Sequence, residues 1–341
     1  AEQIEIVKGP AALLYGSGSG ANSIDSAGGP ITIIGTASAT DAVGVLLSNL
    51  AVVGGIGDVF IDGMSPAGIG IQFENGASVS TTTGAIGLYG TGADFGLDIA
   101  DGALDTDSGD ITLEGTATAA TATAGVRVTG DGLVTNGGDI TITGTSAGGV
   151  GVQLGDGSAF AIGSGGGSIT IEGTGIDAGV LMQGNQVTSG GGAVSITGTG
   201  DNIGVSLADS DITSGAGDIS IRGDAAVASS AVGVRLDDTR LLATSGDVRV
   251  TGLGVSTGMW MLGGEIGTDS GHIDLRGRGT MPGGGSGLEI QAARIATDTG
   301  GIELSGTGNR AGGVVLHAGS SIDAGDSLVV VRADSGPGDA I

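Results

Sequence analysis

The sequence predicts an all-β fold, a right-handed parallel β-helix (solenoid) of about twelve coils with three short strands in each coil. Three observations predict it. A strand-like motif recurs every 25–29 residues, a second motif follows each copy, and a lone apolar position precedes the next copy. The motifs alternate apolar and other residues, which puts successive side chains on opposite faces of a strand. A fixed repeat of this length indicates stacked coils, and parallel crossovers prefer the right hand.

The first predicted strand of each coil reads apolar-x-apolar-x-Gly. Copies include "ITIIG" at 31, "ITLEG" at 111, "ITITG" at 140, "ISIRG" at 219 and "IELSG" at 302, while "LVVVR" at 328 keeps the pattern without the glycine. Its first and third residues are apolar in every copy. We therefore expect these two residues to line a narrow core.

The second predicted strand carries a glycine at one fixed position. That glycine recurs at 44, 70, 96, 125, 151, 179, 204, 233, 258, 287 and 313. We interpret it as a strand position next to a sharp corner, where a residue without Cβ relieves crowding. The functional alternative is a groove in which a ligand approaches the backbone.

The third predicted strand is marked by one apolar residue seven positions before the next first strand. These residues are Val79, Leu104, Leu133, Ile162, Val187, Ile212, Leu241, Ile266 and Ile295. The connection after the first strand varies, often by four residues, as in "TATAATATAGV" and "DAAVASSAVGV". Insertions are therefore predicted to gather along one edge of the solenoid, where such proteins vary or bind.

Composition agrees with thin layers of strand and tight turn. The chain of 341 residues has 76 glycines, 2% aromatic residues and 39% hydrophobic residues, and it has no cysteine. Disulfides and thiolate chemistry are thus excluded. No run of 18 apolar residues occurs, so the sequence predicts no transmembrane helix and no membrane insertion by this segment.

The net charge of −26 limits the partners that we expect. A polyanion repels nucleic acid and anionic lipid, so neither is predicted. The basic residues are unevenly placed, because Lys8 and Arg127 are the only ones before residue 171. The N-terminal half therefore has the larger net negative charge.

Catalytic motifs are weak throughout the chain, and we predict no catalytic, cofactor-binding or metal-binding residue. His272 and His317, the only imidazoles, lie nearly two coils apart and read as surface residues. "GTSAG" at 144–148 matches G-x-S-x-G, but it lies in a variable turn rather than between a strand and a helix.

Acid-rich segments leave an enzymatic alternative open, a β-helix polysaccharide lyase or hydrolase. The run "DIADGALDTDSGD" at 98–110 has no basic residue near it, whereas "RLDDTR" at 235–240 has both signs and reads as a charge-balanced surface. We predict no cofactor beyond weak calcium binding to Asp-rich turns. The calcium-binding nonapeptide of β-rolls is absent.

The repeats resemble those of bacterial surface β-helix proteins. "GDITITGTSAGGVGVQL", "GSITIEGTGIDAGVLM" and "GDISIRGDAAVASSAVGVRL" are similar to repeats of filamentous-haemagglutinin-like two-partner secretion exoproteins and of autotransporter passenger domains. The resemblance covers residues 24–341. It implies a Gram-negative protein that is secreted or lies at the cell surface, on the outer face of the outer membrane. It also implies a non-enzymatic role, as a rod-like segment of an adhesin or a subunit of an extracellular fibre.

Residues 4–20, "IEIVKGPAALLYGSGSG", also resemble the plug motif of TonB-dependent receptors, which makes a protein related to those receptors a second alternative. The repeat instead assigns them to a first coil. Ile4 and Ile6 align with Ile31 and Ile33, and "ALLY" at 12–15 aligns with "GVLL" at 44–47. Ile24, seven residues before Ile31, marks the third strand.

The predicted organisation is an atypical N-terminal coil at 1–30 and one continuous solenoid at 31–341 that lacks a C-terminal cap. Solenoids need polar caps, and open strand edges template further pairing. We therefore expect end-to-end self-association or flanking repeats of the same chain. A host-surface or matrix glycan is the other partner that an adhesin of this kind would bind.

Overall fold

A computed structural model describes residues 4–8, 12–15, 22–157, 160–281, 285–309 and 312–335. The chain divides into two compact units, unit 1 (Ala1–Gly175) and unit 2 (Ile176–Ile341). Within the described ranges every regular element is a strand, and the strand pairs are parallel. No described segment forms a helix that could cross a bilayer. The predicted all-β solenoid with three strands per coil is confirmed.

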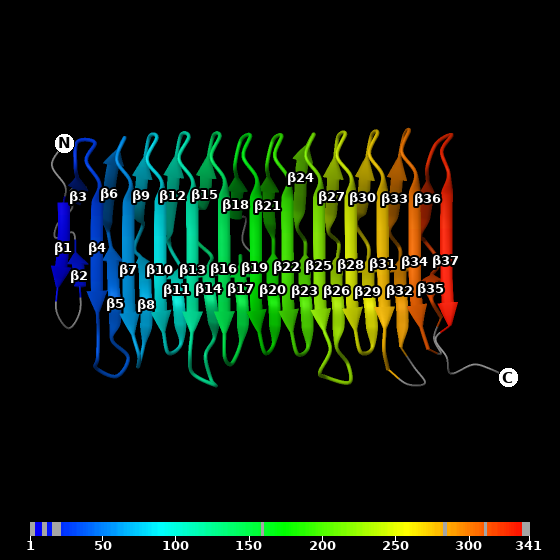
Figure 1. The fold of residues 1–341 in the computed structure, drawn as a ribbon, viewed down its shortest axis with the longest axis horizontal. Coiled ribbons are helices and arrows are strands. Elements are labelled where there is room, and N and C mark those ends of the chain that lie inside the picture. The colour runs from blue at the N-terminus through cyan, green and yellow to red at the C-terminus, as the bar shows by residue number, and fades with distance from the viewer. Residues whose placement is uncertain are drawn as a thin grey trace. The chain divides into compact units, whose positions relative to one another are not determined.

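Unit 1 contains three parallel sheets, which we call A, B and C, and the chain visits them in turn in each coil (Figure 1). Sheet A holds β1 (Ile4–Lys8), β4 (Ile31–Thr36), β7 (Val59–Ser65), β10 (Ile86–Gly92), β13 (Ile111–Ala117), β16 (Ile140–Ser146) and β19 (Ile169–Gly175). Sheet B holds β2 (Ala12–Tyr15), β5 (Val43–Ser48), β8 (Ile69–Glu74), β11 (Phe95–Ile99), β14 (Ala124–Val128) and β17 (Val150–Leu154). Sheet C holds β3 (Asn22–Asp25), β6 (Leu50–Gly55), β9 (Ala77–Thr81), β12 (Gly102–Thr106), β15 (Gly132–Thr135) and β18 (Phe160–Gly163).

Unit 2 repeats the same three-strand coil. Sheet A holds β22 (Val194–Gly200), β25 (Ile219–Ala225), β28 (Val248–Gly254), β31 (Ile273–Gly279), β34 (Ile302–Gly308) and β37 (Val329–Ser335). Sheet B holds β20 (Ala178–Gln183), β23 (Ile203–Ala208), β26 (Val232–Asp237), β29 (Thr257–Leu262), β32 (Ser286–Gln291) and β35 (Val314–Leu316). Sheet C holds β21 (Asn185–Thr188), β24 (Asp211–Gly215), β27 (Arg240–Ala243), β30 (Glu265–Thr268), β33 (Arg294–Thr297) and β36 (Ser321–Asp323).

The core consists of the inward residues of the three strands in each coil. Ile111 and Leu113 of β13 are fully buried, and they pair in register with Ile86 and Leu88 of the preceding coil. The residues predicted to mark the third strand all lie in sheet C, with at most 1% of their surface exposed. Each coil therefore adds one layer of aliphatic side chains to the core. Removing this apolar surface from water stabilises the stacked coils.

Two glycine columns allow sheets A and B to meet closely. A Cβ on Gly70 of β8 would lie 2.5 Å from the backbone nitrogen of Thr91 in sheet A. A Cβ on Gly115 of β13 would lie 2.2 Å from the carbonyl oxygen of Gly125 in sheet B. No larger residue fits either site without moving the backbone. The prediction that the recurring sheet-B glycine relieves crowding is confirmed. The glycine that ends the apolar-x-apolar-x-Gly motif of sheet A faces this sheet-B glycine.

Several turns from sheet C to sheet A share one hydrogen-bonded feature. The buried hydroxyl oxygens of Thr106 and Thr135 accept backbone N–H groups from Gly109 and Gly138, at 3.0 and 2.9 Å. In unit 2, Thr268 accepts from Gly271 in the same way. In other turns, such as those at Ser26 and Ser214, the hydroxyl instead donates to the carbonyl oxygen of the glycine three residues later. In both forms a buried hydroxyl pairs with a backbone group of its own turn.

The connections from sheet A to sheet B vary in length, as predicted. Those after β4, β13 and β25 have six residues, whereas the one after β10 has two. In each unit the longer ones form extended loops where sheet A leads into sheet B (Figure 1). Insertions therefore leave the strand register unchanged.

The N-terminal coil pairs as the repeat predicts, with one correction. Ile4 and Ile6 of β1 lie in register with Ile31 and Ile33. In β2, however, Ala12 pairs with Val45 rather than with Gly44, so the predicted alignment of "ALLY" with "GVLL" is wrong by one residue. All four letters of "ALLY" are apolar or small, so the period-2 pattern that fixes register elsewhere gives no signal there. The rest of the segment 4–20 that resembles a receptor plug lies outside the described residues.

Candidate binding faces

The outward side of sheet A carries a column of residues that precede the motif glycine, or Ala333 in its place on β37, and we call it the pre-glycine column. In unit 1 its members from β7 to β19 are in register: Asp62, Tyr89, Glu114, Thr143 and Glu172. A carboxylate therefore recurs at every second coil, with an uncharged side chain between. Since parallel strands lie about 4.8 Å apart, the carboxylates repeat at about 9–10 Å.

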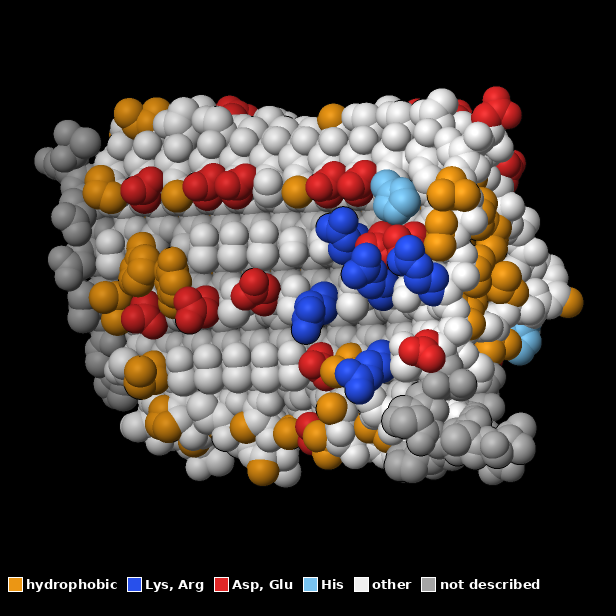
Figure 2. Space-filling view, turned by 45° about the vertical axis from the view of Figure 1, so that its right-hand side comes forward, with side chains coloured by type: hydrophobic (Ala, Val, Ile, Leu, Met, Phe, Trp, Pro, Cys, Tyr) orange, Lys and Arg blue, Asp and Glu red, His pale blue; other side chains and the backbone are white. Residues whose placement is uncertain are grey.

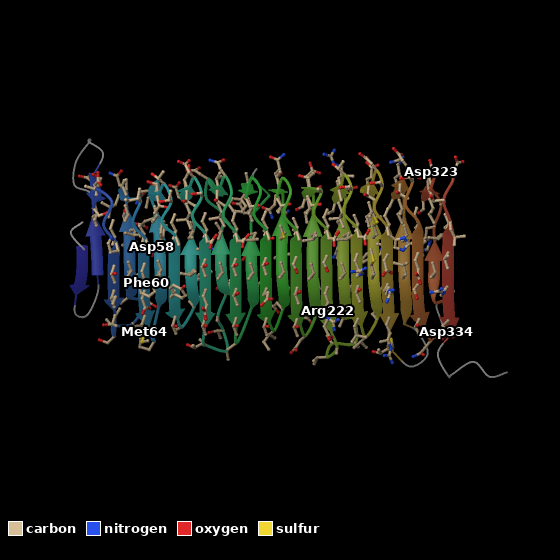
Figure 3. All side chains as sticks on the ribbon, turned by 45° about the horizontal axis from the view of Figure 1, so that its top comes forward. Asp58, Phe60, Met64, Arg222, Asp323 and Asp334 are labelled. Atoms are coloured by element: carbon tan, nitrogen blue, oxygen red, sulfur yellow. The ribbon has the colours of Figure 1, made fainter. Side chains whose placement is uncertain are left out.

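Tyr89 of this column forms an aromatic pair with Phe60. The rings of Phe60 and Tyr89 stack with centroids 5.1 Å apart. The ring of Tyr89 lies over Gly87, where a Cβ would approach it to 2.9 Å. Phe60 and Met64 are 39% and 51% exposed on the same side, and Figure 3 shows both projecting from the sheet. Burial raises the pKa of the neighbouring Asp62 above 3.8.

The pre-glycine column of unit 2 has the opposite charge. From β25 to β37 its members are in register: Arg222, Thr251, Arg276, Ser305 and Arg332. An arginine recurs at every second coil, with a hydroxyl side chain between. Figure 2 shows the blue side chains of sheet A gathered on one face.

Buried Asp274 organises part of this basic face. It is 4% exposed, and its carboxylate oxygens accept hydrogen bonds from Arg276 Nε at 2.8 Å and from Arg249 Nε at 3.4 Å. Its hydrogen bond and negative charge raise the pKa of Arg276. Arg222 and Arg278 show no ion pair with any described residue. A shallow hollow of about 260 Å³ lies between Arg276 and Arg278.

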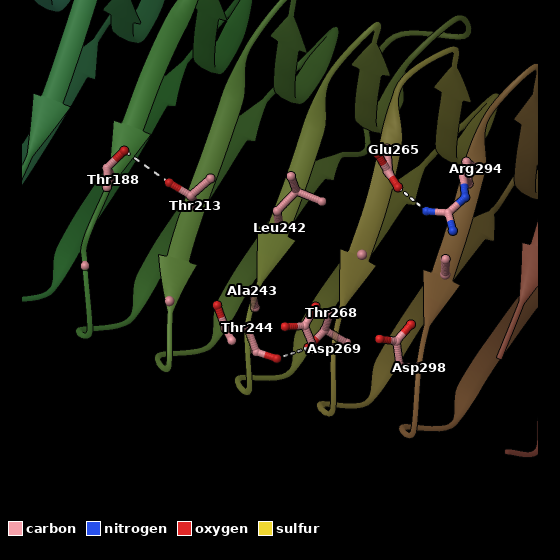
Figure 4. Close-up of a pocket in the computed structure, with 14 residues that line it drawn as sticks. Thr188, Thr213, Leu242, Ala243, Thr244, Glu265, Thr268, Asp269, Arg294 and Asp298 are labelled. Atoms are coloured by element: carbon pink, nitrogen blue, oxygen red, sulfur yellow. Dashed lines mark hydrogen bonds and ion pairs between the residues drawn. The ribbon is translucent and has the colours of Figure 1, made fainter. Parts of the chain in front are cut away.

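A groove of about 470 Å³ is cut into the outward side of sheet C in unit 2 (Figure 4). Leu242 forms one wall, and the ion pair between Glu265 and Arg294 lies on another side. Gly267 and Ala296 lie in register with Leu242, and their missing or short side chains create the hollow. Asp269 and Asp298 line the turn edge.

Sheet B of unit 2 presents the only tryptophan. Trp260 lies between Arg235 and Glu289 in register, and the guanidinium of Arg235 lies 5.1 Å from its ring centroid. Arg235 Nε also donates to Asp237 at 2.8 Å. Glu289 contacts His317 Nε2 at 2.9 Å. An aromatic ring, two carboxylates and an imidazole thus share one open face.

The two histidines are not brought together. His272 precedes β31 of sheet A, where its backbone N–H donates to Asp247, whereas His317 follows β35 of sheet B. His317 has a carboxylate partner and is 41% exposed. The Ser146 hydroxyl of "GTSAG" is buried and accepts the backbone N–H of Gly149 at 3.0 Å, so it holds a turn.

The acid-rich run at 98–110 requires a correction. Asp98 is 2% exposed and forms a bidentate ion pair with Arg127, with both N–O distances 2.8 Å. Arg127 also covers the ring of Phe95 at 4.3 Å. The prediction that no basic residue lies near this run is wrong, because Arg127 lies 29 residues away in sequence and one coil away in space.

Aspartates of the turns into sheet A bridge adjacent coils. The Oδ1 atom of Asp110 accepts the backbone N–H of Asp139 at 2.8 Å, and Asp139 accepts that of Ser168 at 2.7 Å. Asp58, Asp218 and Asp247 do the same. Within the described ranges no three acidic or histidine side chains are placed to hold a metal ion together. Weak calcium binding at these turns stays a prediction.

Comparison with known proteins gave no match to a family model, to a curated protein or to a solved structure.

Proposed function

We propose that this protein is a non-enzymatic extracellular structural protein, an adhesin segment or a fibre subunit, whose coil stack is extended end to end. One observation carries the proposal. On β37, Val329 and Val331 pair with core residues Ile302 and Leu304, yet they are 39% and 50% exposed. The register predicted from "LVVVR" at 328 is therefore wrong by one residue, in another run of consecutive apolar residues. In the sheet-A strands from β4 to β34, the equivalent inward residues are buried.

The surroundings of β37 support the same proposal. Leu316 and Leu328 are 46% and 71% exposed beside it. A sheet edge with exposed apolar side chains is a template for another strand. A further coil, from flanking repeats or from a second copy, would bury these side chains and pair the backbone of β37.

The experiment uses the 341-residue chain in about 1 M salt, where the Debye length is about 3 Å and charge contacts are screened. We expect concentration-dependent growth in sedimentation velocity and linear particles in negative-stain electron microscopy. Val329→Lys with Val331→Lys should prevent this growth, because it places two charges on the stacking surface. A wild-type chain that stays monomeric at all concentrations would contradict stacking between copies.

The extracellular location is tested on intact cells of the source organism. We expect protease added outside the cells to remove the protein while a cytoplasmic marker survives. If the protein survives protease treatment until the cells are lysed, the proposed extracellular location is wrong.

A polysaccharide lyase or hydrolase is the second candidate, and the face around Trp260 favours it. An aromatic ring beside the Glu289–His317 pair and Arg235 combines a sugar platform with acid–base groups. The test incubates the protein with acidic glycans and calcium. Turnover that is lost in Glu289→Gln would replace the non-enzymatic proposal, and we expect none.

A further inference from the structure

The pre-glycine columns of the two units match each other in spacing and oppose each other in charge. Asp62, Glu114 and Glu172 recur at every second coil of unit 1. Arginines recur at every second coil of unit 2, at positions 222, 276 and 332. Both columns lie on the outward side of sheet A, and the intervening residues are uncharged.

We propose that sheet A of unit 1 in one molecule docks laterally on sheet A of unit 2 in a second copy of this chain. Equal spacing lets three carboxylates meet three arginines at once. The match holds whether the two faces run in the same or in opposite directions, and Glu114 meets Arg276 in both. This contact is independent of the end-to-end stacking proposed above.

The arginines retain the donors that such a contact needs. Arg222 shows no described partner, and Arg276 gives its Nε to Asp274, which leaves its terminal nitrogens free of described contacts. The side chains of Arg276 and of Arg332, which also pairs with Glu303, are 55% and 67% exposed. Since packed sheets lie about 10 Å apart, an arginine and a glutamate span the gap, and guanidinium binds carboxylate bidentately.

The other residues of the acidic face also favour docking of a second copy on it. Phe60, Met64 and the ring of Tyr89 form an apolar area next to Asp62. The ring of Tyr89 covers Gly87 and stacks on Phe60 of the preceding coil. The docked faces would thus bury apolar surface between rows of ion pairs.

Salt dependence gives the contact a signature. The chain carries a net charge of −26, which makes copies repel at long range. At about 0.01 M salt the Debye length is about 30 Å and this repulsion dominates, whereas at about 0.1 M it is about 10 Å and direct ion pairs survive. We expect lateral association to peak near about 0.1 M salt and to vanish at about 1 M.

Variants that each lose one of the two faces test the pairing. Glu114→Arg with Glu172→Arg, and separately Arg222→Glu with Arg332→Glu, should each abolish lateral association, measured by light scattering at about 0.1 M salt. Arg276 is left intact because it holds Asp274. An equimolar mixture of the two variants should associate again, because the first variant keeps an intact basic face and the second keeps an intact acidic face. Failure of the mixture to associate would overturn the proposal if both variants keep the wild-type circular dichroism.

Two further measurements distinguish docking between copies from the binding of a foreign polyanion. Arg240→Glu reverses one charge on sheet C and should leave association unchanged, in contrast to Arg222→Glu. Dextran sulfate is the probe for the foreign polyanion. If the wild-type chain does not associate near about 0.1 M salt but binds dextran sulfate through Arg222, the face serves an acidic polymer and our inference is wrong. Loss of end-to-end growth in high salt would leave this inference untouched.

Discussion

The sheet-A faces of the two units share a backbone plan and differ in charge. Ile111 and Leu113 in unit 1, like Ile273 and Leu275 in unit 2, are fully buried and precede a glycine that faces sheet B. The outward residue just before that glycine differs between the units, because Glu114 of unit 1 occupies the position that Arg276 has in unit 2. Inward residues and glycines therefore define the coil, while outward residues are free to carry function.

The largest predicted effect breaks what the units share. Gly115→Ala in unit 1 and Gly277→Ala in unit 2 each place a Cβ close to a sheet-B carbonyl oxygen, at 2.2 and 2.0 Å. Backbone must move to relieve this overlap. We expect the free energy of unfolding to fall by about 3 kcal/mol or more in both units, measured by urea denaturation.

Glycines in open turns provide the control. Gly137 and Gly191 have no atom within 4 Å of an added Cβ. Replacing either by alanine should change the free energy of unfolding by less than about 0.5 kcal/mol. Equal effects at the glycines between sheets A and B and at the turn glycines would show that the glycine columns are not what allows the two sheets to meet closely.

A smaller effect separates the two buried carboxylates. Arg127→Met removes the only described ion-pair partner of Asp98, and we expect a loss of about 3 kcal/mol because a buried charge is left uncompensated. Arg249→Met leaves Asp274 paired with Arg276, so the loss should be about 1 kcal/mol or less.

Thermal unfolding of the single and double variants checks this contrast. Arg249→Met combined with Arg276→Met should cost more than the sum of the two single changes, because only the double variant strips Asp274 of both partners. Additive losses would mean that the two arginines do not act on a shared carboxylate.

The smallest effect concerns Asp62. Burial raises its folded-state pKa above the 3.8 of the unfolded chain, so the folded state binds the proton more tightly. The contribution of Asp62 to stability is then greatest below pH 3.8 and declines as the pH rises through the folded pKa. Asp62→Asn should remove this decline and change stability at neutral pH by less than about 0.5 kcal/mol. A carbon-13 carboxylate titration of Asp62 measures its pKa, and a value at or below 3.8 would contradict the shift.

Much of the fold can be predicted because burial imposes period 2 on each strand. That pattern aligns Ile4 with Ile31, and the structure pairs them. The predicted register of Ala12 is wrong where the pattern fades, in a run of four apolar or small residues. Hydrophobic periodicity thus specifies register only where inward and outward residues differ in polarity.

The binding faces escape prediction because their residues are distant along the chain. Asp98 and Arg127 are separated by 29 residues, and members of the pre-glycine column by one coil each. A sequence read in order shows no cluster there. Writing the coils beneath one another at the motif glycine places Glu114 above Thr143 and Glu172, and it places the arginines at 222 and 276 on either side of the threonine at 251.

The facing glycine columns have a consequence for how such a chain can change its length over generations. A Cβ on each glycine of these columns would meet a backbone atom of its own or an adjacent coil. An insertion of a few residues inside a strand would therefore move the glycine out of line with its partner. Gain or loss of a whole coil by duplication or deletion keeps every glycine facing its partner. The inheritable unit of growth in this architecture is therefore the coil, and charge patterns such as the two-coil alternation can be copied with it.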